Sequence, residues 1–196
     1  MADIASQPQL DDGYVRKKWT VSECRTLVDN DLLTPGRFEL IEGEILFKMG
    51  QSRLHVFLVA RIIEIMTSIF GASVQSQAPI GVGEIDEHND PEPDVTVLKE
   101  LLTAYLYREP DPRTDVLLAI EIADSTLRGD TTTKASMYSS SGVQEYWVVS
   151  IPDRQVIVHR SPTTGGYKAK QTFAEGDTVS PLAAPTVEIK VSDLLV

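Results

Sequence analysis

The sequence is poor in cysteine and in positive charge. Cys24 is the only cysteine among 196 residues, so an internal disulfide and a zinc cluster built on several thiolates are excluded. Lys and Arg number 18 against 29 Asp and Glu, which gives a formal net charge of −11. This balance excludes a broad basic surface for electrostatic capture of nucleic acid, so any such contact must be local.

Long apolar runs are also missing. Nowhere do eighteen apolar residues follow one another, and the polar first residues lack the apolar segment of a secretory signal. With the single cysteine, these absences predict a cytoplasmic protein without membrane contact. The hydrophobic fraction of 42% and the charged fraction of 24% are typical of a folded globular domain.

The chain divides into a short arm and one domain. Residues 1–18 show no hydrophobic period and predict a flexible N-terminal arm, whereas residues 19–196 predict a single domain. At the start of that domain, Thr20 and Glu23 have the spacing of a helix capping box. A short helix is therefore expected to follow Thr20.

A hairpin and a long helix come next. The apolar segments 38–41 and 45–47 flank Glu42-Gly43, which predicts two short strands joined at a glycine. From residue 52 to residue 70, apolar side chains recur every three or four positions. This is the clearest helical period in the chain, and it predicts a core helix.

The remaining segments are mostly strands. Five have suitable length and composition: 73–80, 94–98, 116–123, 145–150 and 154–160. The segment 116–123 is nearly continuously apolar, as expected for a central strand covered on both faces. A helix is predicted over 131–141, and the tail beyond residue 161 predicts peripheral strands. This order of elements favours an α/β (α+β) fold around one mixed sheet.

Glu121 is the one charged residue in the apolar segment 116–123. Because burial of an unpaired carboxylate costs several kcal/mol, a partner, a proton or a metal must neutralise it. A structural ion pair and a position at the exposed end of the strand are the alternatives to a functional role.

Two other places carry side chains of similar interest. Asp94 follows Pro93 where a loop becomes a strand, so its position is fixed, although a turn aspartate is the alternative. Asp130, Lys134 and Tyr138 stand four apart, so they share one helix face that could look toward the carboxylates. For Asp130 and Lys134 the alternative is an exposed ion pair.

These residues belong to an ordered set: Pro93-Asp94, Glu121, Ser125-Thr126, Asp130, Lys134 and the segment GVQEYWVV at 142–149. With the segment 38–45 and His55, this set resembles the Uma2 (DUF820) endonuclease family of the PD-(D/E)xK nuclease superfamily, over about residues 20–160. The resemblance implies a restriction-endonuclease-like domain with a mixed central sheet flanked by helices. It also implies metal-dependent hydrolysis of phosphodiester bonds.

The resemblance further implies which residues act. Asp94 and Glu121 match the two metal-binding acids and would hold Mg²⁺ or Mn²⁺. Ala123 stands where the superfamily motif has its lysine, and Lys134 on the following helix is the matching position. Asp94, Glu121 and Lys134 are therefore the expected catalytic residues.

Four further residues are expected to support them. Glu39 or Glu42 would contact the metal through a water, and Asp130 would tune Lys134. His55, at the head of the long helix, could contact a phosphate, and a structural role at the helix end is its alternative.

The expected substrate is DNA, and a homodimer would suit a cut in both strands. Four basic residues near the site in sequence are predicted to form a small positive rim: Lys48, Arg53, Arg61 and Arg128. A catalytically weak or inactive nuclease-fold module for binding or assembly is the alternative function, which Ala123 and the acidic surface would suit. Paired acids also occur in glycosidases, but the aromatic content of 7% offers little for stacking on a sugar.

Overall fold

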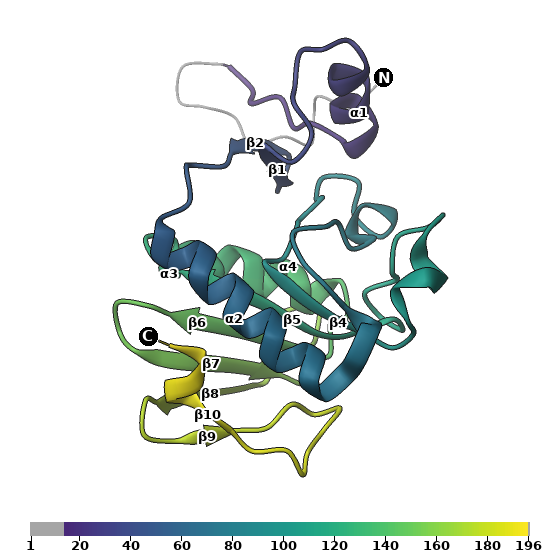
Figure 1. Ribbon diagram of the computed structural model, residues 1–196. Helices are drawn as coiled ribbons and strands as arrows, with labels where there is room; N and C mark the ends of the chain where they lie inside the picture. The colour runs from purple at the N-terminus through teal and green to yellow at the C-terminus, as the bar shows by residue number, and fades with distance from the viewer. Residues whose placement is uncertain (1–13, 196) are drawn as a thin grey trace.

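The computed structural model describes residues 14–195, and its centre is a six-stranded sheet in the order β3-β4-β5-β6-β7-β8 (Figure 1). The strands are β3 Val74–Gln75, β4 Val95–Leu98, β5 Val116–Ala123, β6 Glu145–Ser150, β7 Gln155–Arg160 and β8 Ala169–Ala174. Strands β5 and β6 pair in parallel, and the other neighbours in this sheet pair antiparallel. The predicted α/β (α+β) fold with a mixed central sheet is confirmed.

Helices cover the two faces of this sheet. Helix α2 (Arg53–Phe70) crosses one face, and the short helices α3 (Leu127–Gly129) and α4 (Ala135–Ser140) lie on the other (Figure 1). Side chains of a strand alternate between its faces. Alternate residues of β5 therefore pack in different cores: Leu118, Ile120 and Ile122 with α2, and Ala119 and Ala123 with α4. Strand β5 is central, as its nearly continuous apolar run predicts, and Glu121 lies on its α4 face, in contact with Tyr138.

The N-terminal elements form a smaller group above the sheet in Figure 1. Helix α1 (Val21–Asp29) begins with the predicted capping box of Thr20 and Glu23. Strands β1 (Phe38–Ile41) and β2 (Glu44–Phe47) form the predicted hairpin. Their turn places Gly43 at a φ of 78°, a conformation that glycine adopts without strain.

The predicted strand 73–80 is wrong in length. Strand β3 covers only Val74–Gln75, because its pairing with β4 is limited to those two residues. Gln77 then turns the chain at a φ of 47°, and β3 is an edge strand of the sheet. Apolar composition correctly indicated a strand here, but the number of residues that pair with β4 sets its length.

The predicted helix 131–141 begins too late. The helical segment starts at α3, four residues earlier, and continues through a π-helical turn over Asp130–Lys134 into α4. The hydroxyls of Thr131 and Thr132 donate hydrogen bonds to the carbonyls of Leu127 and Arg128 within this segment. A π turn holds one residue more than an α turn. A search for apolar residues at α-helical spacing cannot detect this extra residue.

The C-terminal strands are peripheral, as predicted. β8 forms an edge of the main sheet, and β9 (Thr178–Val179) pairs with β10 (Ile189–Lys190) in a separate two-stranded sheet. Short 3₁₀ turns complete the fold: η2 Gly71–Ser73, η3 Val82–Glu84, η4 Leu102–Tyr105 and η6 Val191–Leu194. Of the predicted flexible arm, residues 1–13 lie outside the described residues, while Arg16 and Lys17 form ion pairs.

Helix α2 with the adjoining turn to Ser73 is long and apolar enough to cross a membrane by length and composition alone. Its buried side chains pack instead against the sheet: Leu58, Val59, Ile62 and Met66. In this fold the segment is the core helix that its period predicted.

His159 on β7 makes stability depend on pH. Its side chain is buried between Tyr146 and Tyr167, and neither ring nitrogen has a hydrogen-bond partner among the described residues. Burial and then the nearby Lys170 charge lower the pKa of His159 to about 4. The unfolded chain therefore takes up a proton below about pH 6.5 that the folded chain does not bind until the pH is much lower.

We expect this residue to remove about 2–3 kcal/mol of the unfolding free energy as the pH falls from 7 to 4. His159→Phe keeps an aromatic ring of similar size and cannot take up the proton. Urea unfolding at several pH values should give a flatter pH dependence for H159F than for the wild type. Parallel pH profiles for the two proteins would contradict the assignment.

Candidate active site

A cleft of about 740 Å³ opens between the β1–β2 hairpin and one end of the main sheet. Its walls come from residues 16–18, the hairpin, the linker into α2, the end of β5 and the π turn. Five charged side chains with little or no exposure gather in it: Glu39, Asp94, Glu121, Asp130 and Lys134. The structure thus brings together residues that are far apart in the sequence.

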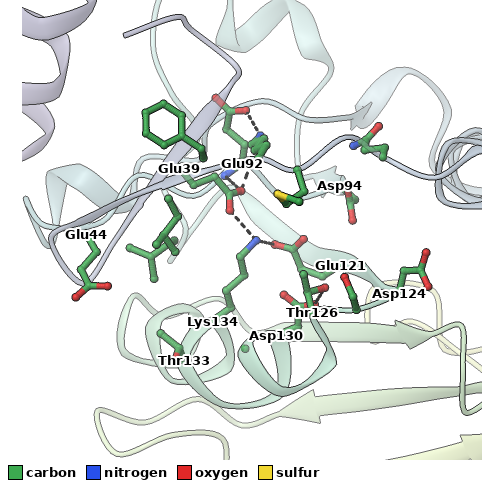
Figure 2. A pocket seen from close by; sticks show the side chains of 18 of the residues that line it. Glu39, Glu44, Glu92, Asp94, Glu121, Asp124, Thr126, Asp130, Thr133 and Lys134 are labelled. Carbon is green, nitrogen blue, oxygen red and sulfur yellow. Dashed lines mark hydrogen bonds and ion pairs between the residues drawn. The ribbon is translucent and has the colours of Figure 1, made fainter. Parts of the chain in front are cut away.

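Lys134 lies between two carboxylates. Its Nζ is 2.9 Å from Oε1 of Glu121 and 2.9 Å from Oε2 of Glu39 (Figure 2). Tyr138 donates a second hydrogen bond of 2.9 Å to the same oxygen of Glu121. The prediction that Lys134 and Tyr138 share a helix face toward Glu121 is confirmed.

Asp130 is buried beside this group, in the same π turn as Lys134. Its carboxylate accepts a hydrogen bond of 2.6 Å from the hydroxyl of Thr126. The alternative of an exposed Asp130–Lys134 ion pair is therefore wrong, because both side chains point into the protein and Lys134 pairs with Glu39 and Glu121.

Burial and like charge shape the electrostatics. Burial raises the pKa of Glu121 well above its usual value, Lys134 opposes this shift, and Asp94 and Glu39 add to it. Burial acts to lower the pKa of Lys134, but Glu121, Glu39 and Asp130 together raise it above its usual value. Lys134 is therefore a permanent cation in a site where carboxylates outnumber it.

Asp94 is fixed from two sides. Its Oδ2 accepts a hydrogen bond of 2.8 Å from the backbone N–H of Ile122, and its Oδ1 lies 3.1 Å from Nε2 of His55. The hydrogen bond to Asp94 raises the pKa of His55. Both partners are distant in sequence, so the alternative of a local turn aspartate is wrong. His55 contacts the first predicted metal ligand.

Of the two hairpin acids predicted to support the metal, Glu39 and Glu42, only Glu39 reaches Lys134. Its Oε1 also accepts a hydrogen bond from the backbone N–H of Glu92, at 3.1 Å. Glu42 lies in the hairpin turn at a φ of 52° and lines the cleft, but no ion pair or hydrogen bond joins its side chain to the described residues. The structure thus favours Glu39 over Glu42 as the supporting carboxylate.

Ala123 is fully buried in the core that α4 forms with the sheet. A lysine at this position would have to occupy space that apolar side chains fill. The ammonium group of Lys134 reaches Glu121 from the π turn instead.

The predicted positive rim is largely wrong. Lys48 lines the cleft and pairs with Glu92, but Arg53, Arg61 and Arg128 do not line it. Closeness in sequence to the site is a poor guide here: Arg61, for example, pairs with Glu64 on helix α2. The cleft is lined instead by Arg16, Lys17 and Lys18. Three consecutive basic residues before Trp19 were the signal for them.

Asp94 and Glu121 suit a hard divalent cation. Among residues 14–195, no three His, Cys, Asp or Glu side chains are close enough to form a metal cluster. Mg²⁺ commonly uses only one or two carboxylates, with waters and substrate phosphate as its other ligands. Oε1 of Glu121 accepts hydrogen bonds from Lys134 and Tyr138, whereas Oε2 accepts none from the described residues. The donor set therefore fits Mg²⁺ or Mn²⁺ with two protein ligands.

Lys134→Met removes the cation between Glu39 and Glu121 and leaves two carboxylates in a desolvated space. Because breaking a buried ion pair costs about 3–5 kcal/mol, we expect a loss of unfolding free energy of that order in urea denaturation. Adding Glu121→Gln to K134M removes one of the opposed charges and should restore part of the loss.

The exposed Lys190 provides the matched control. K190M should change the unfolding free energy by no more than about 0.5 kcal/mol. If K134M is as stable as K190M, the ion pairs of Lys134 do not stabilise the fold.

Comparison with known proteins agrees with this architecture. No curated protein matches the chain. The fold is similar to the crystal structure of a protein from Anabaena variabilis described as a putative nuclease belonging to DUF820, with a TM-score of 0.64 at 19% identity. The similarity covers 89% of this chain and 96% of that one. The model of the Uma2 family, described as "Putative restriction endonuclease", matches residues 29–192. The resemblance drawn from the motifs is confirmed, and this chain belongs to the Uma2 family.

Proposed function

We propose that this protein is a metal-dependent endonuclease that hydrolyses DNA phosphodiester bonds, with Asp94, Glu121 and Lys134 as its catalytic residues. One observation carries the proposal: a carboxylate of β5, a carboxylate directly before the neighbouring strand β4 and one ammonium group converge in a cleft of a Uma2-family fold. Cleavage at this cleft in a cytoplasmic homodimer would allow both strands of a duplex to be cut.

Asp94 and Glu121 would hold Mg²⁺ or Mn²⁺. When bound, such an ion makes a water acidic enough to supply hydroxide near neutral pH and offsets the charge that grows on the phosphate. The short antiparallel pairing of β4 with β5 sets the spacing of the two acids, because Val95 pairs with Ile120. Asp94 and Glu121 are the next residues along that register.

Lys134 would act on the substrate as a fixed cation. An ammonium group can donate a hydrogen bond to the attacking water or to a phosphate oxygen. Glu121 and Glu39 keep Lys134 charged and oriented. Tyr138 holds Glu121 in place through its hydroxyl, so Tyr138 is a positioning residue.

His55 would position Asp94. Its ring nitrogen lies 3.1 Å from Oδ1 of Asp94, while the Ile122 N–H fixes Oδ2. The two contacts together leave Asp94 little rotational freedom. Asp130 would act in the same indirect way on Lys134, since its charge helps to raise the pKa of that side chain.

Cleavage of supercoiled plasmid DNA tests the proposal. We expect nicking or linearisation with Mg²⁺ or Mn²⁺ and none with EDTA. Asp94→Asn, Glu121→Gln and Lys134→Met should each lower the rate by about 100-fold or more, because each removes a group that stabilises the transition state.

Asp29→Asn and Glu188→Gln are matched substitutions at exposed acids. They control for a contaminating nuclease and for the change of charge, and both variant proteins should cleave plasmid at the wild-type rate. Cleavage that persists unchanged in D94N and E121Q would overturn the proposed centre.

A second function, a nuclease-fold module without catalysis, has one observation in its favour. The ammonium group of Lys134 already pairs with two carboxylates, those of Glu39 and Glu121. Such a module has no need to bind a metal at Asp94 and Glu121, whereas the endonuclease does.

Thermal unfolding with and without Mn²⁺ separates the two functions. At an ion concentration of about 100 times Kd, binding adds about 2.7 kcal/mol of stability, which raises Tm by about 5–10 °C for a chain of this size. We expect this rise in the wild type and its loss in D94N and E121Q. A Tm that responds equally in all three proteins, or in none, would favour the module.

A further inference from the structure

The charges that line the cleft are unevenly distributed. Eight carboxylates and five Lys or Arg side chains line it. Three of the five basic residues are consecutive, Arg16, Lys17 and Lys18, whereas the buried end of the cleft holds Asp94, Glu121 and Asp130. The cleft thus has an acidic end suited to a cation and a basic segment suited to an anion.

The basic segment is fixed in place by the hairpin turn. The N–H of Trp19 donates a hydrogen bond of 2.9 Å to the carbonyl of Gly43. A Cβ at Gly43 would lie 2.8 Å from Cβ of Lys18, so the two backbones are in close contact. His88 also contacts the carbonyl of Trp19, at 2.8 Å from Nδ1. Lys18 therefore has a defined position at the cleft.

The charges of this segment are available to a ligand. Arg16 pairs with Glu44 at 3.3 Å and Lys17 pairs with Glu23 at 2.7 Å, and all four side chains are exposed to solvent. Exposed ion pairs contribute about 1 kcal/mol or less, so a phosphate could replace the carboxylates at small cost. Lys18 forms no ion pair among the described residues.

Apolar side chains are exposed in the same cleft. Leu46, Phe47 and Met49 line it, with exposed fractions of 46%, 68% and 88%. They belong to β2 and the linker that follows, on the hairpin that also holds the basic segment. Nucleic-acid strands are often bound by this combination of basic groups along the backbone and an aromatic face for a base.

We propose that Arg16–Lys18, Phe47 and Met49 form a strand-binding wall, which holds one nucleic-acid strand across the cleft. The basic side chains contact successive phosphates, and Phe47 stacks on an unpaired base. The inference rests on the proposed function for the class of ligand, and it adds a binding surface outside the catalytic residues. It also explains how a chain with a net charge of −11 can hold a polyanion by local contacts.

Two triple variants with the same change in net charge test the basic half of the wall. R16Q/K17Q/K18Q removes the wall's cations, whereas K99Q/K168Q/K190Q removes three exposed lysines that do not line the cleft. Binding of a labelled single-stranded oligonucleotide is measured by fluorescence anisotropy at several salt concentrations, with Ca²⁺ in place of Mg²⁺ to limit cleavage.

We expect the wall variant to bind at least 10-fold more weakly than the control variant. The slope of log affinity against log salt should also become shallower by about 0.7 for each phosphate that the variant no longer neutralises. Equal affinities and slopes for the two triple variants would overturn the proposal, and so would a wild-type protein that binds no oligonucleotide at low salt.

A second pair of variants tests the aromatic half. Phe47→Ala should weaken binding of the single strand by about 5-fold or more, because stacking of one base contributes about 1–3 kcal/mol. Tyr107 is 99% exposed and does not line the cleft, so Y107A is the matched control. If F47A and Y107A weaken oligonucleotide binding equally, Phe47 is not part of the strand-binding wall.

These binding measurements are independent of the test of catalysis. If neither the wild type nor any variant cleaves plasmid, but the wall variant binds the oligonucleotide more weakly than the control variant, the strand-binding wall is supported and the endonuclease proposal is overturned. If D94N abolishes cleavage while both triple variants bind equally well, the endonuclease proposal is supported and the strand-binding wall is overturned.

Discussion

The buried carboxylate of Glu121 is the constraint on which the site depends. It lies on the α4 face of β5, 5% exposed, within a strand that is otherwise apolar. Such a group must be compensated, and two side chains of the helical segment that follows do so, Lys134 and Tyr138. The π turn that sets the spacing of this segment is therefore as important to the site as the strand itself.

The same constraint connects the hairpin to the sheet. Lys134 pairs with Glu39 of β1, and Lys48 pairs with Glu92 just before β4. The apolar core beneath the hairpin is small, with Val21, Cys24 and Leu40 as its buried members among the described residues. Ion pairs across the cleft thus act together with backbone hydrogen bonds, such as that from the N–H of Asp90 to the carbonyl of Leu40, to hold the hairpin against the rest of the domain.

Sequence reasoning found the parts of the site that follow from local patterns. An isolated charge in an apolar strand identified Glu121, and spacing by four identified Lys134 and Tyr138. The length of β3 and the π turn could not be predicted, because strand pairing and one inserted helical residue leave no mark in a hydrophobic period. The prediction of a positive rim was largely wrong for a related reason. Nearness to the site in sequence does not determine whether a side chain such as Arg53 or Arg128 lines the cleft.

The parallel pairing of β5 with β6 has a consequence for how the ammonium group is delivered. Parallel neighbours need a crossover connection, and residues 124–144 provide it, with the π turn in its middle. In a strand, side chains must alternate between the two faces of the sheet, and the backbone must pair with its neighbours. A residue on the crossover has neither constraint. The position of the cation is therefore set by the crossover, whereas the positions of Asp94 and Glu121 are set by the pairing of β4 with β5.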